Sequence, residues 1–212
     1  MRSKRAWLAP VLVLALTPAM AGCGYNAIPT KEERARAAWG DVQSQYQRRA
    51  DLVPNLVATV QAAAVQERTV LNEVIEARAR ATAVSVSPDD AAAMAQFQES
   101  QSELAGALSR LLMVVENYPQ LQSNRNFLEL QSQLEGAENR IAIARRDYNE
   151  AVRDYNTELR TFPGVIWAST FHGGAEPMQP FEATEAAQTA PQVNFNLDAP
   201  PASAGQAPPA GQ

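Results

Sequence analysis

The sequence predicts an all-α protein: an antiparallel four-helix bundle of long helices, followed by a disordered C-terminal tail. Residues 31–162 contain only three proline and three glycine residues in 132 positions. The rest of this region is rich in alanine, glutamate, glutamine, arginine and leucine, which favour helices. Apolar residues recur there at alternating steps of three and four, as on the buried face of a packed helix. No comparable stretch shows the sustained alternation of a strand.

The N-terminus resembles the signal peptide of a bacterial lipoprotein. Basic residues lie within the first five positions, and residues 6–16 form an apolar segment shorter than the ~20 residues of a spanning helix. Met20-Ala21-Gly22-Cys23 resembles a lipobox, so residues 1–22 are predicted to be removed and Cys23 to be acylated. The alternative is an uncleaved membrane anchor with an ordinary Cys23. Either way the remainder is expected outside the cytoplasm, and Gly24 favours the outer membrane where two membranes exist.

A short tether is expected at residues 23–30, and the bundle over residues 31–171. The first helix has an apolar stripe through Trp39 and Tyr46. Asp51 is suited to cap a second helix with Pro54 in its first turn, so a break is expected there. A folded-back helix would then cover the first stripe. The alternative is one long helix kinked at Pro54, because the stripe keeps its phase across the proline.

The later helices are predicted by the same periodicity and by local end signals. The second stripe runs to Val84, interrupted only by Glu67, and the third is interrupted only by Gln101. Ser87 is expected to cap the third helix, which Pro119 ends. The fourth helix is expected to begin at a cap formed by Asn126 with Glu129. Its stripe is the most regular of the chain: Phe127, Leu130, Leu134, Ala137, Ile141, Ala144, Tyr148, Ala151 and Tyr155.

Beyond the fourth helix the composition changes. Pro163-Gly164 ends the helix, and residues 165–171 form a short apolar segment expected to fold back over the end of the bundle. Residues 172–212 are expected to be extended and largely disordered, because their proline, alanine and glycine content cannot bury enough apolar surface. Val193 and Phe195 differ, since a spacing of two puts both side chains on one face of an extended segment. They are predicted to dock on the bundle or on a partner.

Charge and composition exclude several classes of function. Without the three basic residues of the signal segment, the chain has 15 basic and 23 acidic residues, a net charge of −8. Such a balance argues against nucleic acid as a partner, because that binding depends on clustered lysine and arginine. A single cysteine excludes an intramolecular disulfide, and a single histidine, His172, excludes a metal site built on several histidines or cysteines. No cofactor or metal is expected.

Glu67 is the most unusual candidate, an acid on an apolar stripe. A buried acid with a raised pKa is one hypothesis. The favoured one is an ion pair with Arg49, Arg140 or Arg145 that sets the register of the helices.

Tyrosine and asparagine recur with a spacing of seven at Tyr148-Asn149 and Tyr155-Asn156. A polar ligand groove is one reading of this repeat. Core tyrosines whose hydroxyls lie at the edge of the core are favoured.

Several motifs together resemble the LemA family, in order and over about residues 25–195. They are Tyr25-Asn26, Ala38-Trp39, Gln47-Arg48-Arg49-Ala50-Asp51-Leu52-Val53-Pro54-Asn55-Leu56-Val57, Leu104-Ala105-Gly106-Ala107-Leu108-Ser109-Arg110-Leu111-Leu112, Glu116-Asn117-Tyr118-Pro119, Asn126-Phe127-Leu128, Glu138-Asn139-Arg140-Ile141, Tyr148-Asn149, Tyr155-Asn156, Phe162-Pro163 and Pro191-Gln192-Val193-Asn194-Phe195. The resemblance implies a membrane-anchored, extracytoplasmic four-helix bundle. Most such proteins are anchored by an N-terminal helix, and many have His-Glu where this chain has Gln66-Glu67. The family has no established catalytic activity.

The motifs of common enzyme classes are missing from the sequence. It has no serine nucleophile elbow, phosphate-binding glycine loop or metal-binding histidine pair, so no enzyme is expected. Two functions remain. The first is a tethered scaffold or adaptor that binds another envelope protein. The alternative is a module that holds a small or lipidic ligand between its helices.

Overall fold

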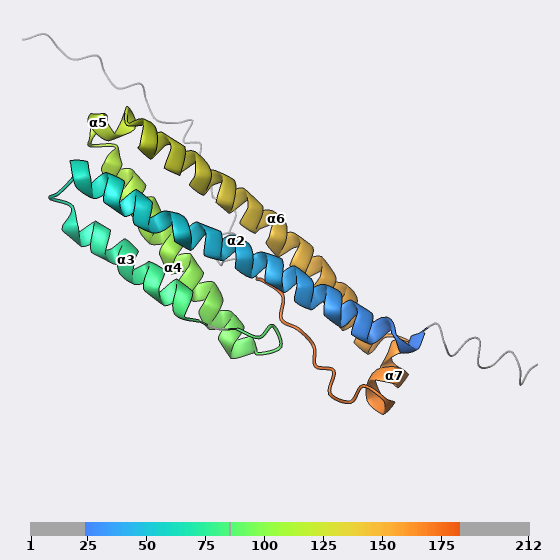
Figure 1. Ribbon diagram of the computed structural model, residues 1–212. Coiled ribbons are helices and arrows are strands. Elements are labelled where there is room, and N and C mark those ends of the chain that lie inside the picture. Colours follow the sequence, from blue (N-terminus) through green and yellow to red (C-terminus); the bar gives the residue numbers. More distant parts are fainter. Residues whose placement is uncertain (1–23, 85, 183–212) are drawn as a thin grey trace, which may run out of the picture. The chain divides into compact units, whose positions relative to one another are not determined.

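A computed structural model describes residues 24–84 and 86–182, and all regular secondary structure in these residues is helical (Figure 1). The elements are α2 (Ala27–Ala63), α3 (Arg68–Ala83), α4 (Ala91–Val115), α5 (Pro119–Gln122), α6 (Arg125–Arg160) and α7 (Gly164–Thr170). The four long helices α2, α3, α4 and α6 alternate in direction along the chain (Figure 1). The predicted all-α bundle is confirmed.

The expected break at Pro54 is wrong. Helix α2 continues through Pro54 to Ala63, and the chain turns only at residues 64–67. Pro54 has no N–H for the carbonyl of Ala50, four residues earlier. Arg78 of α3 supplies the missing donor, since its Nε lies 2.8 Å from the Ala50 oxygen. The alternative of one long helix across Pro54 is correct as far as Ala63, whereas the residues from Arg68 form a separate helix, α3, that folds back on α2.

Two helix starts differ from the sequence expectation by two or three residues. Asp90, not Ser87, caps α4 by accepting hydrogen bonds from the N–H groups of Ala92 and Ala93. Asn124, not Asn126, caps α6 in the same way. Asp90 directly precedes α4, whereas Ser87 lies three residues earlier; Asn124 directly precedes α6, whereas Asn126 lies within the helix.

The buried side chains form two apolar cores at successive levels of the bundle. The first core lies between the C-terminal half of α2, α3, most of α4, α5 and the start of α6. The second lies between the N-terminal half of α2, the start of α4 and the C-terminal half of α6. The predicted stripe of the fourth helix supplies buried residues to both cores, Leu134 to the first and Ile141 to the second.

Helix α3 does not reach the second core, and another part of the chain covers it there. Residues 172–181, here called the strap, lie along the bundle with Met178 and Phe181 buried. The packed part of the described residues therefore extends to Phe181, ten residues beyond the expected end at 171. The packed region also starts earlier than expected, since residues 27–30 form the first turn of α2 and Ile28 is buried.

Candidate functional site

The two apolar cores are separated by a polar layer centred on Arg49. This arginine is 2% exposed and lies in α2 between Tyr46 of the second core and Val53 of the first. Its Nη1 donates to Oε1 of Glu138 on α6 at 2.7 Å. Its Nη2 donates to the main-chain and side-chain oxygens of Gln101 on α4, at 3.1 and 2.7 Å. One guanidinium thus joins three helices.

Gln101 extends the layer to the fourth long helix. Its Nε2 donates to the carbonyl oxygen of Ala81 in α3 at 3.0 Å. Gln101 interrupts the apolar stripe of α4 because its amide both accepts from Arg49 and donates to Ala81. Glu138 keeps half of its side chain exposed, so the charge of the buried arginine is balanced at the edge of the bundle. Nε of Arg49 is buried without a hydrogen-bond partner among the described residues, while the other contacts of the layer link all four long helices at one level of the bundle.

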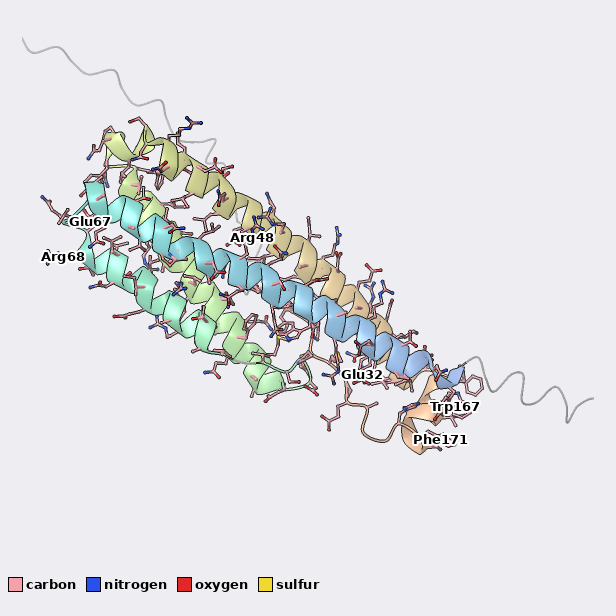
Figure 2. The ribbon with its side chains drawn as sticks, in the orientation of Figure 1. Glu32, Arg48, Glu67, Arg68, Trp167 and Phe171 are labelled. Atoms are coloured by element: carbon pink, nitrogen blue, oxygen red, sulfur yellow. The ribbon has the colours of Figure 1, made fainter. Side chains whose placement is uncertain are left out.

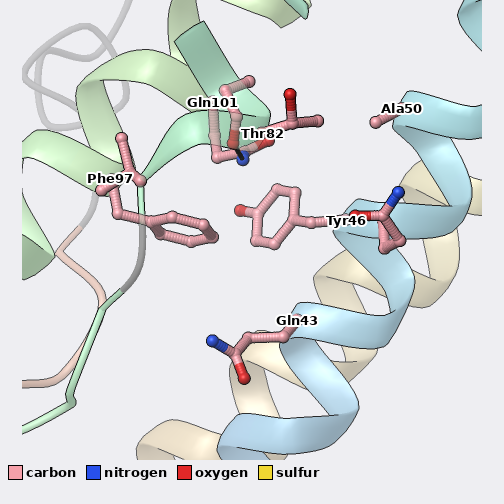
Figure 3. Close-up of a pocket in the computed structure, with 9 residues that line it drawn as sticks. Gln43, Tyr46, Ala50, Thr82, Phe97 and Gln101 are labelled. Carbon is pink, nitrogen blue, oxygen red and sulfur yellow. Dashed lines mark hydrogen bonds between the residues drawn. The ribbon is translucent and has the colours of Figure 1, made fainter. Parts of the chain in front are cut away.

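A small hollow opens beside the polar layer (Figure 3). It has a volume of about 110 Å³ and is lined by Gln43, Tyr46, Gln47, Ala50, Ala81, Thr82, Val84, Phe97 and Gln101. Tyr46 and Phe97 meet edge to face with ring centroids 5.2 Å apart. Burial raises the pKa of the Tyr46 phenol, although Arg145 and Arg49 oppose that change. The hollow is smaller than the ~300 Å³ at which small-molecule pockets begin.

Two larger hollows lie on the surface. One of about 320 Å³ lies over α3 and α4, where the ion pair between Arg80 and Glu103 forms part of its wall. Another, of about 240 Å³, lies between α2 and α6. Both are open to solvent. Neither is the enclosed cavity expected of a ligand carrier.

The second candidate site is a clamp in which α6 binds the backbone of the strap. Asn149 donates to the carbonyl oxygen of Phe181 at 3.0 Å and accepts from the N–H of the same residue at 2.8 Å. Asn156 does the same with Met178, at 2.8 and 3.0 Å. Each asparagine side chain thus pairs with both the N–H and the carbonyl group of one strap residue, as a neighbouring strand would.

Two further contacts fix the strap between the clamp residues. The Tyr148 hydroxyl donates to the carbonyl oxygen of Gln179 at 2.7 Å, and the N–H of Gln179 donates to the carbonyl oxygen of Pro88 at 2.8 Å. The Phe181 ring packs edge to face on Tyr148, with centroids 5.6 Å apart, and lies against Trp39. The favoured prediction is confirmed, since Tyr148 and Tyr155 are buried in the second core. The asparagines of the repeat hold the chain's own strap rather than a ligand.

The arginines and the acid predicted as one ion-pair site do not come together. Glu67 lies at the turn between α2 and α3 (Figure 2), and its expected arginine partner is replaced by Tyr118, whose hydroxyl donates to Oε1 at 2.9 Å. The hydrogen bond to Glu67 raises the pKa of Tyr118. Arg140 is exposed, and the guanidinium of Arg145 lies 4.7 Å from the centre of the Phe181 ring. Of these candidates, Arg49 is buried and pairs with Glu138.

The physical reason for this difference is the position of the turn. A break at Pro54 would have left Glu67 inside a helix, on its buried stripe. The actual turn at residues 64–67 removes it from the stripe, since it directly precedes α3. Cys23, Val193 and Phe195 lie outside the described residues, so lipidation and tail docking stay predictions.

Comparison with known proteins agrees with this architecture. The model of the LemA family matches residues 38–195. The chain belongs to the LemA family. Its relatives include the magnetosome proteins MamQ 1 and MamQ 2 of Paramagnetospirillum magneticum, each 27% identical over 158 residues, and MamQ of Magnetospirillum gryphiswaldense, 25% identical over 158 residues. Each alignment covers 66% of this chain and 58% of the relative, so the chain spans little more than half the length of these relatives.

Among residues 24–84 and 86–182, no helix is both long and apolar enough to span a membrane. Within the same residues no three histidine, cysteine, aspartate or glutamate side chains are grouped as metal ligands.

Sequence reasoning missed the roles of Gln101, Glu138, Asn149 and Asn156. The signal for Gln101 was present, because it was the single polar residue in the stripe of α4. Asn149 and Asn156 were noticed as a repeat, but their partner is main chain from a segment expected to be disordered. A hydrogen bond to the main chain of another segment does not alter the spacing of apolar side chains, so the sequence pattern could not reveal it.

Proposed function

We propose that this protein is a non-enzymatic helical scaffold of the bacterial cell envelope, tethered through acylated Cys23 and lying on the extracytoplasmic side of the membrane. The observation that carries the proposal is the self-occupied groove of α6. The groove that a ligand could enter is filled by Met178 and Phe181, and Asn156 and Asn149 bind the backbone of these two residues. The surfaces left for recognition are the outer faces of the helices.

Electrostatics and family membership support a structural role. Ion pairs between neighbouring helices link the outer surfaces of α3 and α4; they join Arg80 to Glu103 and Arg110 to Glu73. The magnetosome proteins to which the chain is similar are named for a cellular structure rather than for a reaction. No enzymatic group is proposed for this chain.

The tether is tested by mass spectrometry of the protein purified from membranes. The expected result is a chain that begins at Cys23 with acyl chains on that residue. Cys23→Ser is expected to leave an unprocessed precursor or to release the protein from membranes. A wild-type chain that retains residues 1–22 and has no lipid on Cys23 would show that the uncleaved anchor is correct.

The scaffold role is tested by photo-crosslinking in intact cells. A photoreactive residue at Met113, which is 63% exposed on α4, is expected to capture one defined envelope protein. The same residue at exposed position 150 on α6 is the matched control for random collisions. Equal capture of many proteins at both positions, or of none at any exposed position, would contradict a scaffold.

The alternative, a module that holds a small or lipidic ligand between the helices, requires the strap to leave its groove. Lipid extracted from the purified protein tests it. A stoichiometric bound lipid that is lost in Asn149→Ala/Asn156→Ala would favour the ligand carrier over the scaffold.

A further inference from the structure

The exposed large apolar side chains of the described residues are concentrated at one end of the bundle. Half of them belong to α7, its immediate flanks and the residue next to Gly24. They are Phe162 at 81% exposed, Phe171 at 64%, Ile166 at 48%, Tyr25 at 44% and Val165 at 42%. We call these five residues, together with Trp167, the apolar end.

Aromatic packing makes the apolar end one structural unit. Tyr25 meets Trp167 and Phe171 edge to face, with centroids 5.9 Å apart in both pairs, and Trp167 and Phe171 are 5.6 Å apart. Figure 2 places Trp167 and Phe171 at the opposite end of α2 from Glu67. Residues 162–171 contain no charged side chain. A surface with this composition favours a lipid interface, where tryptophan and tyrosine lie at the level of the headgroups.

Close packing holds the apolar end in place. A Cβ atom added to Gly164 would lie 2.1 Å from the carbonyl oxygen of Glu158, so only glycine allows α7 to fold this closely against the end of α6. The N–H of Val165 donates to the carbonyl oxygen of Thr161 at 2.8 Å and fixes the start of α7. Phe171 and Ile166 are therefore presented from a fixed turn of helix.

The position of Gly24 connects this surface to the membrane anchor. A Cβ atom on Gly24 would lie 3.0 Å from Nε1 of Trp167 and 3.5 Å from Cγ of Pro163, so Gly24 lies directly against α7. Cys23 is the preceding residue, and one residue spans at most about 3.6 Å. Acyl chains on Cys23 would thus enter the bilayer within a few ångströms of the apolar end.

We propose that the apolar end docks into the headgroup layer of the membrane that holds the chain, so that α7 lies in the interface and the bundle is fixed at that end rather than free on a tether. The proposal rests on the lipid tether proposed above. The occupant of the surface is a lipid bilayer. Binding comes from burial of Phe162, Ile166 and Phe171 rather than from charge, since a basic patch is absent from residues 162–171.

The experiment uses the full chain reconstituted in phosphatidylcholine vesicles whose acyl chains are brominated near the headgroup. In a Trp7→Phe background the remaining tryptophans are Trp39, which is buried at 5% exposed, and Trp167. Quenching of tryptophan emission by the brominated lipid is expected. It should disappear in Trp167→Phe and should not weaken at high salt.

Matched variants locate the contact. Ile166→Ser/Phe171→Ser is expected to reduce the quenching strongly. Ile75→Ser, which alters an isoleucine of equal exposure on α3 (50%), is expected to leave it unchanged. Equal quenching in the double-serine variant and the parent would overturn the docking.

Flotation with the vesicles separates failure of the docking from failure of the tether. A chain that floats while Trp167 is not quenched overturns the docking alone. A wild-type chain that retains residues 1–22, has no lipid on Cys23 and is still quenched overturns the tether and leaves the docking standing. Unquenched chains that crosslink in pairs through position 166 identify a second copy as the occupant, and overturn the proposal.

Discussion

Arg78 of α3 completes the backbone hydrogen bonding of α2 at the point where Pro54 interrupts it. The carbonyl oxygen of Ala50 has no N–H partner at position 54, and Nε of Arg78 donates to it at 2.8 Å. A charged donor to a partly buried carbonyl contributes about 1.5–3 kcal/mol. The contact explains why a proline is tolerated inside a helix of 37 residues. It also fixes the position of α3 along the axis of α2.

The first prediction concerns this pair. Arg78→Met should lower the free energy of unfolding by about 1–3 kcal/mol, because the Ala50 carbonyl is left without a donor. In a Pro54→Ala background the helix supplies its own N–H, so the same substitution should cost much less. Urea unfolding of the four proteins measures the coupling. Arg80→Met, which removes an exposed ion pair with Glu103, is the control and should cost under about 1 kcal/mol. Equal costs of Arg78→Met in both backgrounds would mean that Arg78 does not replace the lost donor.

The second prediction concerns the polar layer. Glu138→Ala removes the carboxylate from an arginine that is 2% exposed, and should destabilise the bundle by about 3 kcal/mol. The combined change Arg49→Met/Gln101→Leu/Glu138→Ala removes the charge and its partners together, and should recover much of that loss. Thermal unfolding provides the comparison. A triple variant less stable than Glu138→Ala would show that the layer contributes net stability.

The third prediction concerns the strap. Asn149→Ala and Asn156→Ala each remove two hydrogen bonds to the strap backbone, and each should cost about 1–3 kcal/mol. Hydrogen exchange should report faster exchange at the N–H of Phe181 in the first variant and of Met178 in the second. Asn139→Ala, an exposed asparagine of the same helix, should change neither. Unaltered exchange in all three variants would argue against the clamp.

The fourth prediction separates the strap from the tail. A chain that ends after Asn196 should melt like the full chain, because residues 199–212 lack the composition for a core. A chain that ends before Pro191 should lose stability or partner capture if Val193 and Phe195 dock. A chain that ends after His172 should lose several kcal/mol, since Met178 and Phe181 leave the second core. If the first two truncations are indistinguishable in melting and in crosslinking, the docking of Val193 and Phe195 is wrong.

The fifth prediction concerns alkaline pH. Burial raises the pKa of Tyr155 from 10.0 to about 12 and raises that of Tyr148 as well. The unfolded chain then loses these protons at lower pH than the folded chain. The tyrosine contribution to stability is therefore complete below pH 10, and is lost as the pH rises from 10 through about 12. Urea unfolding at pH 8 and pH 11 should show a smaller loss in Tyr155→Phe than in the parent. Tyr25→Phe, at an exposed position, should reproduce the loss of the parent.

The sequence by itself determined the helical class, the buried face of each long helix and the membership of the LemA family. The spacing of apolar residues within a helix depends only on nearby positions in the sequence. Leu134, Ile141 and Tyr148 were therefore correctly predicted to lie in the core. Only the tertiary structure decided where α2 ends, because an arginine 28 residues away restores the hydrogen bond that Pro54 removes. Likewise, Glu138 and Asn149 acquired their roles through partners 89 and 32 residues distant. The strap is the clearest case. Its few apolar residues cannot order a chain alone, and Met178 and Phe181 are buried only because α2, α4 and α6 form the second core against which they pack.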